Sequence, residues 1–156
     1  MLVRDLMTPI PITVAPDLSV IDARQRMVER RIRHLLVVEH DRLVGIVTDR
    51  DIRLNLPSPA TSLSVWEMNY LLARLTVGEV MTKAVIVVEP ERDAGVAARI
   101  MIDHKIGALP VMDGTRPVGI VTESDFVRAF AHDAPLPGGA RRTRGESVLG
   151  VRETRT

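Results

Sequence analysis

Cysteine is absent from the 156 residues, which excludes disulfide bonds and thiolate metal sites and fits a reducing cytoplasm. Aromatic residues make up only 3% of the chain, so its core must be built from aliphatic side chains and methionine. No apolar run approaches the length of a membrane span, and the first residues lack the architecture of a signal peptide. These absences together predict a cytoplasmic protein with no membrane partner.

A dominant charge of one sign is also missing. The 21 Lys and Arg residues nearly balance the 20 Asp and Glu residues, and the formal net charge of +1 gives no strong field for nucleic acid. The sequence has no Walker-type phosphate loop and no His-Glu-x-x-His, and its four histidines lack metal-ligand spacing. We therefore expect no catalytic residues, no metal site and no catalytic cofactor.

A seven-residue segment occurs twice in the chain. Gly-Ile-Val-Thr-Asp-Arg-Asp at 45–51 returns as Gly-Ile-Val-Thr-Glu-Ser-Asp at 119–125. The two copies are 74 positions apart, and the same spacing separates Met7 from Met81, each of which precedes a threonine. The halves of the chain align without insertion or deletion between these landmarks, which indicates an internal duplication.

Each half follows the same order of predicted elements. A short β-branched strand is ended by a proline and followed by a helical pattern, and two further apolar runs separated by a polar turn form a hairpin. In the first half these segments are 10–14, 20–28, 35–38 and 43–47, and in the second they are 84–88, 92–103, 109–112 and 118–121. A second helix begins in each repeated segment, so the predicted unit is β-α-β-β-α.

A unit of this kind is too small to stand alone. Two helices cannot cover both faces of a three-stranded sheet in about 55 residues, so the copies should pack on each other. The predicted fold class is α/β (α+β), with two β-α-β-β-α repeats packed sheet to sheet in pseudo-twofold symmetry. The predicted divisions are repeat 1 at 1–56, a helical connector at 57–76, repeat 2 at 77–131 and a flexible Arg/Gly-rich tail at 132–156.

The connector and the tail differ in apolar content. Residues 64–67 have the spacing of a capping box, which predicts a helix that carries Trp66 and Tyr70. These large side chains should be partly covered, either by the chain's own repeats or by a second subunit. The tail contains Gly, Pro and Arg, and a solvated terminus is favoured over contact with nucleic acid because no aromatic residue is interleaved for base stacking.

The threonine and the last aspartate of each repeated segment also have the spacing of a capping box. A strand that turns directly into a helix presents backbone N–H groups outward, and these can receive an anion such as phosphate. Thr48 with Asp51, and Thr122 with Asp125, are therefore two candidate seats for a ligand. A plain helix cap without a ligand is the alternative at each seat.

The order of these motifs resembles a tandem pair of cystathionine-β-synthase (CBS) domains. The resemblance is carried by the two Met-Thr starts, the turns at Pro16 and Pro90, the strands Leu-Leu-Val-Val and Leu-Pro-Val-Met, and the paired Gly-Ile-Val-Thr-x-x-Asp segments. It covers residues 1–131 and is strongest to stand-alone prokaryotic CBS-pair proteins, including the CBS part of acetoin-utilisation-type proteins.

The resemblance implies a regulatory module that senses an adenosine-containing ligand in clefts between its repeats. The implied ligand is AMP, ADP or ATP, with NAD or S-adenosylmethionine as the second choice. In the family the motif threonine contacts phosphate, the aspartate binds ribose, basic residues before the second strand lie near the phosphates, and the first strand lines the adenine. Those roles fall here on Thr13, Val14, Arg33, His34, Thr48, Asp51, Val88, Thr122 and Asp125.

The two seats should differ in charge. Gly107 and Ala108 of the second repeat replace Arg33 and His34 of the first, so the first offers more positive charge to a phosphate. The resemblance also implies a homodimer and an unidentified regulated protein that reads the ligand-bound state. Two other functions stay open: a nucleic-acid-associated regulator that uses the basic tail, and a structural dimerisation module without a ligand.

Overall fold

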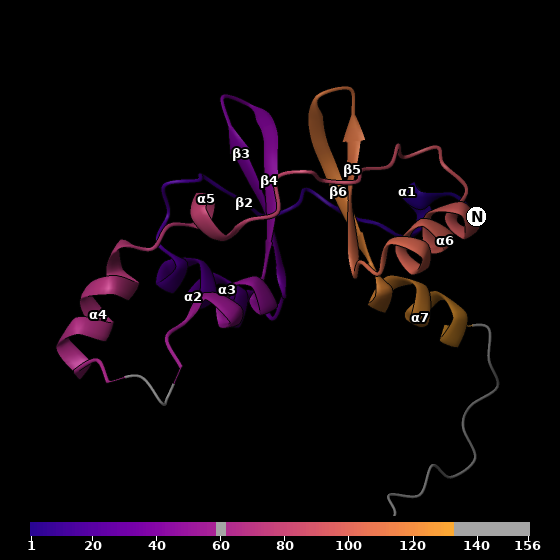
Figure 1. Cartoon of the computed structure of the whole chain (residues 1–156). Coiled ribbons are helices and arrows are strands. Elements are labelled where there is room, and N and C mark those ends of the chain that lie inside the picture. The colour runs from indigo at the N-terminus through magenta and orange to yellow at the C-terminus, as the bar shows by residue number, and fades with distance from the viewer. Residues whose placement is uncertain (59–61, 133–156) are drawn as a thin grey trace, which may run out of the picture.

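The computed structural model describes residues 1–58 and 62–132, so the tail predicted at 132–156 lies outside the described residues except for His132. Two three-stranded sheets, of order β2-β3-β4 and β1-β6-β5, stand side by side at the centre of the molecule (Figure 1). The elements are α1 (Val3–Leu6), β1 (Thr8–Pro9), β2 (Thr13–Val14), α2 (Val20–Arg30), β3 (His34–Glu39), β4 (Arg42–Thr48), α3 (Asp49–Asn55), α4 (Val65–Arg74), α5 (Val77–Val80), α6 (Ala94–His104), β5 (Ala108–Asp113), β6 (Arg116–Thr122) and α7 (Glu123–His132).

The two predicted hairpins are confirmed. β3 pairs antiparallel with β4, and β5 pairs antiparallel with β6 in an equivalent register. The first hairpin turns at His40 and Asp41, which both have positive φ, as the tight turn between right-twisted strands requires. The second turns at Gly114, whose φ of 61° is easily reached without a side chain.

The long helix of each repeat begins and ends by the same local chemistry. The side chains of Ser19 and Asp93 accept hydrogen bonds from backbone N–H groups in the first turns of α2 and α6. Arg31 and Lys105 end these helices in the left-handed conformation, each with φ of 54°. The buried faces are equivalent in the two repeats and consist of Val20, Ala23 and Met27 on α2 and Ala94, Ala97 and Met101 on α6.

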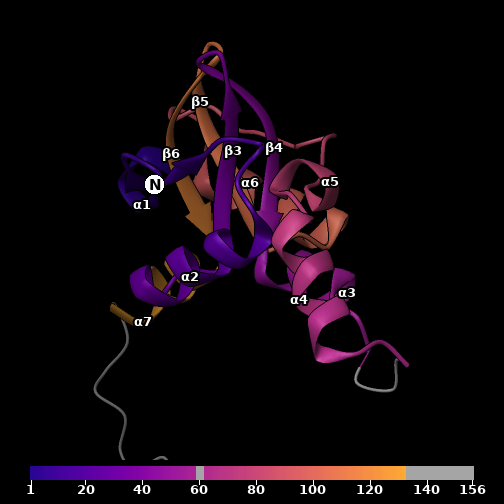
Figure 2. The same ribbon diagram turned by 90° about the vertical axis from the view of Figure 1, so that its left-hand side faces the viewer.

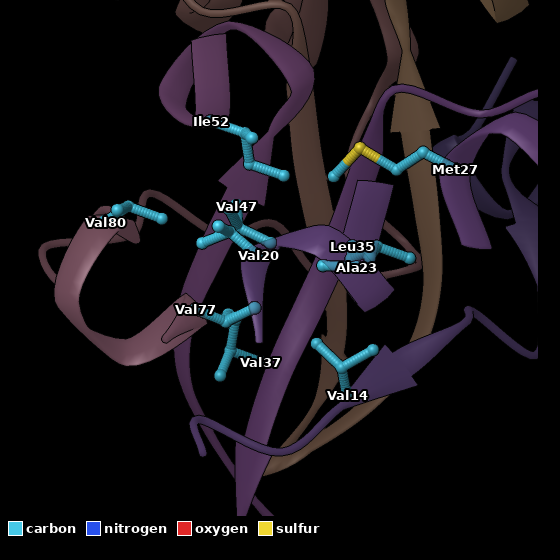
Figure 3. Packing of buried hydrophobic residues seen from close by; sticks show 10 residues of the cluster. All are labelled: Val14, Val20, Ala23, Met27, Leu35, Val37, Val47, Ile52, Val77 and Val80. Carbon is cyan, nitrogen blue, oxygen red and sulfur yellow. The ribbon is translucent and has the colours of Figure 1, made fainter. Parts of the chain in front are cut away.

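The short opening helices are exchanged between the repeats. Val77 and Val80 of α5 point into the hydrophobic core of the first repeat, next to Val20 and Val47 (Figure 3). In the reciprocal arrangement, Val3 of α1 is fully buried in the core of the second repeat. Each core is therefore completed by a segment that precedes the other repeat's first strand, which ties the two repeats together.

The first strands are shorter than the sequence predicts. In the first repeat, Pro9 and Pro11 have no N–H group for a ladder and Ile10 between them has a φ of 53°, so pairing is interrupted between β1 and β2. In the second repeat, segment 84–88 pairs with β5 only at Val88. The bridge partner of Val88 on β5 is Val111. Pro110, the residue before it, has no N–H group to donate the kind of hydrogen bond that the equivalent Leu36 of β3 donates to Ile12.

The predicted connector helix is confirmed as α4, which Ser64 caps by accepting a hydrogen bond from the N–H of Glu67. No residue of α4 is buried, and Trp66 is 86% exposed. The helix lies at the edge of the molecule beside the helices of the first repeat (Figures 1 and 2). Among the described residues, no helix is both long and apolar enough to cross a membrane.

Candidate ligand site

The first motif pair, Thr48 and Asp51, forms the capping box that the sequence predicts. The hydroxyl of Thr48 accepts a hydrogen bond from the N–H of Asp51 at 3.0 Å, and the carboxylate Oδ2 of Asp51 accepts from the N–H of Thr48 at 2.9 Å. Both residues are partly buried at the start of α3. The carboxylate is thus held in one orientation, while its Oδ1 atom has no hydrogen-bond partner among the described residues.

The second motif pair, Thr122 and Asp125, is more enclosed. Asp125 is 7% exposed and is the one buried charged residue in the described part of the chain. Its Oδ2 atom accepts from the N–H of Thr122 at 2.7 Å and from the hydroxyl of Thr122 at 3.1 Å. Its Oδ1 atom forms an ion pair with Arg128 at 3.2 Å. Both carboxylate oxygens of this pair are therefore already engaged.

The glycine of each motif packs closely against a methionine from the other half of the chain. A Cβ atom built on Gly45 would overlap the sulfur of Met81, and one built on Gly119 would lie 2.5 Å from the sulfur of Met7. Close-packed interiors leave no room for such an atom without a shift of the neighbours. Gly45 with Met81, and Gly119 with Met7, thus form two equivalent contacts between the halves of the chain.

The residues after these methionines continue the contact as backbone pairing. Thr82 and Ile46 exchange hydrogen bonds of 2.9 and 3.1 Å, and Thr8 lies opposite Ile120 in the β1–β6 ladder. Each strand that carries a motif is therefore flanked by a segment from the other half of the sequence. The structure places both motif pairs at the boundary between the repeats.

His34 reaches across this boundary. It begins β3 and lies opposite Thr48 in the β3–β4 ladder. A Cβ atom built on Gly107 would lie 3.7 Å from Nε2 of His34 and 3.8 Å from Oε2 of Glu123. An imidazole of the first repeat and a carboxylate of the second therefore approach the same small space, which the glycine leaves open.

Burial lowers the pKa of the His34 imidazole below its ordinary value of 6.5, and the positive charge of Arg33 lowers it further. The carboxylates of Glu123 and Asp51 act in the opposite direction. The net lowering means that the imidazole is mainly neutral at pH 7 and can both donate and accept a hydrogen bond.

The other predicted site residues lie farther from the motif pairs. Thr13 and Val14 are on β2, and β3 separates them from the strand that ends at Thr48, which places them roughly 10 Å away across the sheet. Val88 is buried beside β5, again one strand away from β6. Arg33 is exposed next to His34. The structure thus brings His34 to Thr48 but does not bring the first-strand residues to either motif pair.

Two charged neighbours were missing from the predicted set. Arg128 follows Asp125 by three positions on α7, and this spacing on a helix is a recognisable signal for an ion pair. Glu123 has no comparable signal, because its approach to His34 depends on how the two repeats pack.

Two concave regions lie elsewhere on the molecule. A cavity of about 220 Å³ borders Val88, Glu89 and Arg92, and a larger apolar groove of about 620 Å³ runs between α2, α3 and α4. Neither borders Thr48 or Thr122, so the candidate site rests on its polar groups and its position between the repeats. Within the described residues, no cluster of His, Asp or Glu is suited to hold a metal ion.

Comparison with known proteins identifies the repeated unit. The sequence profile of the CBS domain matches residues 3–58 and, a second time, residues 77–132. The two matches include both motif pairs and exclude α4, which agrees with a connector between two copies of one domain.

Solved structures of similar sequence share the whole arrangement. The CBS domain pair of protein MJ0100, solved with 5′-methylthioadenosine and S-adenosyl-L-methionine, is 30% identical with a TM-score of 0.71, over 86% of this chain and 98% of that one. CBSX2, solved with AMP, is 32% identical with a TM-score of 0.68, over 84% and 96%. AcuB from Vibrio cholerae, assigned to acetoin utilization, is 33% identical with a TM-score of 0.70, over 85% and 91%.

Several curated relatives are much longer than this chain. The L-aspartate semialdehyde sulfurtransferase of Methanocaldococcus jannaschii is 33% identical over 131 residues, which cover 83% of this chain but only 23% of the enzyme. A protein from the ribosomal RNA operon of Thermofilum pendens is 35% identical over 136 residues, or 42% of its length. The chain thus spans less than half the length of these relatives.

Proposed function

Because the chain belongs to the CBS-domain family, we propose that it is a regulatory module that binds an adenosine-containing ligand between its two repeats. The AMP, ADP and ATP class is the first choice of ligand, and NAD or S-adenosylmethionine is the second. The observation that carries the proposal is the doubled Thr–Asp pair at the boundary between the repeats. It is supported by the adenosine ligands of two relatives, MJ0100 and CBSX2.

The proposed roles follow from the chemistry of the motif pairs. The hydroxyls of Thr48 and Thr122 stand where a strand passes into a helix. The hydroxyl of Thr48 accepts from the N–H of Asp51 and can donate its own proton to a phosphate oxygen, whereas that of Thr122 would give up its bond to Asp125 to do the same. The carboxylates of Asp51 and Asp125 can accept hydrogen bonds from the two hydroxyls of a ribose. Arg33 and His34 would supply positive charge or a hydrogen bond to a phosphate on the first pair.

The first-strand residues would serve the adenine. Thr13 and Val14 lie on β2, Val88 lies in the equivalent segment of the second repeat, and these residues would line the adenine. Since Thr8 and Thr82 lie directly against the motif strands, the chain next to them offers a second place for the base.

Regulation would act through the relative position of the repeats. A ligand held by groups from both halves stabilises the arrangement that brings those groups together and so shifts the population toward it. An unidentified protein would read that arrangement. Exposed apolar side chains on α4 and on the long helices support a homodimer as the form that responds.

A thermal-shift panel tests the proposal. We expect one of AMP, ADP, ATP, NAD or S-adenosylmethionine to raise the melting temperature, since a ligand at a hundred times its dissociation constant adds about 2.7 kcal/mol to the free energy of unfolding. GMP is the matched control, because it presents the same ribose and phosphate with a different base. Absence of a shift with all five ligands would contradict the proposal and favour a structural dimerisation module.

A further inference from the structure

The smaller cavity, at the edge of the second sheet, lies apart from both motif pairs. It has a volume of about 220 Å³ and is lined by residues 87–89 and 92, by Ile100 of α6, and by Met112 and Gly114 of the second hairpin. α6 lies on the side of the second sheet away from the first repeat (Figure 1). Of the residues predicted to hold adenosine, only Val88 borders this cavity. A ligand here would occupy a different place from one held between the repeats.

Aliphatic side chains and a methionine form the apolar part of the lining. Val88 is 4% exposed and Met112 is 8% exposed, whereas Val87 is 43% exposed and Ile100 is half-buried. The lining contains no aromatic ring on which a base could stack. Its volume is also below the roughly 300 to 1,000 Å³ of sites that hold drug-sized ligands. The cavity therefore suits a small molecule with an aliphatic body and not a nucleotide.

Two opposite charges stand beside this apolar lining. The guanidinium of Arg92 and the carboxylate of Glu89 are 3.5 Å apart, and their side chains are 50% and 72% exposed. Such a pair is weak, because strong charge-assisted hydrogen bonds are about 2.7 to 2.9 Å long and water screens exposed charges. A guanidinium has five N–H donors and a carboxylate has two acceptor oxygens, so both groups can bind a further partner.

The backbone that carries the two charges is held in place. The N–H of Arg92 donates to the carbonyl of Glu89 at 3.1 Å, and the N–H of Val3 donates to the carbonyl of Arg92 at 2.8 Å. Next to them, Arg4 and Glu91 form an ion pair at 3.1 Å and so offset each other's charge. The fixed backbone lowers the entropic cost of ordering Glu89 and Arg92 on a ligand.

The first repeat lacks this combination of residues. Ala15 and Leu18 stand 74 positions before Glu89 and Arg92, and Leu18 packs against the first hydrophobic core. His40 stands at the position equivalent to Gly114, which adds no side chain to the lining. The two opposite charges beside an apolar cavity are thus a feature of the second repeat alone.

We propose that this cavity binds a small aliphatic α-amino acid such as leucine. An amino acid is zwitterionic at neutral pH, so its carboxylate pairs with Arg92 and its ammonium pairs with Glu89. Its side chain covers Val87 and Ile100 and removes apolar surface from water. The inference goes beyond the proposed function, because it adds a second class of ligand at a site that neither motif pair shares.

An NMR titration of the ¹⁵N-labelled full chain with L-leucine tests where the amino acid binds. We expect the amide signals of Val88, Arg92 and Gly114 to shift and those of Thr48 and Thr122 to stay unchanged. Absence of shifts, or shifts confined to the motif pairs, would overturn the proposal. Shifts at the cavity in a chain that binds no adenosine ligand would support this site and contradict only the proposed function.

Two analogues of leucine separate its charged groups. 4-Methylpentanoate lacks the ammonium group and 3-methylbutylamine lacks the carboxylate, and both keep the aliphatic body. We expect each analogue to bind about tenfold more weakly than leucine, because each loses one charge-assisted contact. If either analogue bound as tightly as leucine, the cavity would not recognise the zwitterion, and the proposal would be overturned.

Calorimetric titration of three variants assigns the contacts. We expect Arg92→Gln to lower the affinity for leucine about tenfold and to leave that for 3-methylbutylamine within about twofold. Glu89→Gln should likewise weaken leucine and leave 4-methylpentanoate binding within about twofold. Arg4→Gln is the matched control, because it removes a neighbouring exposed ion pair outside the lining. A loss for Arg4→Gln equal to that for Arg92→Gln would show an effect of net charge and would overturn the assigned contact.

Discussion

At the scale of single residues, the two motif aspartates have the same sequence context and different surroundings. Asp51 keeps one carboxylate oxygen without a partner among the described residues, whereas Asp125 is buried and paired with Arg128. Arg128 offsets the charge of Asp125, so it leaves little positive charge for a phosphate at the second seat. At the first seat, neither Arg33 nor His34 forms an ion pair with Asp51 among the described residues, so their side chains remain available to a phosphate.

We therefore expect Asp51→Ala to remove more AMP affinity than Asp125→Ala. Hydrogen bonds from hydroxyl groups to a charged acceptor contribute about 1.5 to 3 kcal/mol, which corresponds to roughly ten- to a hundred-fold in affinity. The free energy of unfolding should change in the opposite order, with the larger loss for Asp125→Ala. Loss of a cap costs about 1 kcal/mol, and Asp125 makes more hydrogen bonds in a more buried place.

Calorimetric titration with AMP, paired with melting curves of both variants, measures the two effects separately. Unchanged affinity with lowered stability in both variants would leave the motifs as helix caps. A larger loss of AMP affinity for Asp125→Ala than for Asp51→Ala would contradict the charge argument, while both aspartates would still belong to a ligand site.

At the scale of elements, the long helices, both hairpins and the capping boxes could be predicted because their signals are local. Periodic apolar residues and a capping side chain lie within one turn or one strand of the feature they specify, as Ser19 and Thr48 illustrate. The exchange of α1 and α5 could not be predicted in this way. Val3 and Val77 are similar apolar residues in the sequence, and no neighbouring residue indicates which of the two cores each one packs into.

The same distinction applies to the candidate site. The Thr–Asp pairs follow from the repeated segment, and Arg128 could have been found from its i,i+3 spacing to Asp125. The approach of His34 to Glu123 depends on packing between sequence-distant segments, which no short pattern encodes.

The exchange of α1 and α5 between the two cores predicts the effect of two substitutions. Val3 is fully buried in the second core and Val77 is fully buried in the first, so each substitution to alanine should cost about 1 to 3 kcal/mol, as the loss of two buried methyl groups implies. Hydrogen exchange should show that Val3→Ala weakens protection in β6 and that Val77→Ala weakens it in β4. The two variants serve as controls for each other. If Val3→Ala weakened hydrogen-exchange protection only in the sheet β2-β3-β4, the placement of α1 in the second core would be contradicted.

At the scale of the whole molecule, the pseudo-twofold symmetry has a consequence for assembly. Val28 of α2 and Ile102 of α6 occupy positions 74 residues apart, and each is 69% exposed. A dimer in which four repeats form one closed disc uses equivalent surfaces of both repeats, so such paired apolar positions are suited to its contacts. Trp66 on α4 is more exposed, but the described residues include no second-repeat counterpart of α4.

We expect the full chain to sediment as a dimer and the double variant Val28→Glu with Ile102→Glu to sediment as a monomer. A charged group placed in an apolar contact loses its hydration without gaining a partner, and this cost is large compared with the free energy of a modest interface. Thr115→Glu is the matched control, because it adds a negative charge at the exposed turn of the second hairpin. A full chain that is monomeric would contradict the disc, and dissociation caused by Trp66→Glu alone would move the contact to α4.

Because the boundary between the repeats also carries both motif pairs, a dimer that holds the repeats in place should bind AMP more tightly than the monomeric variant does.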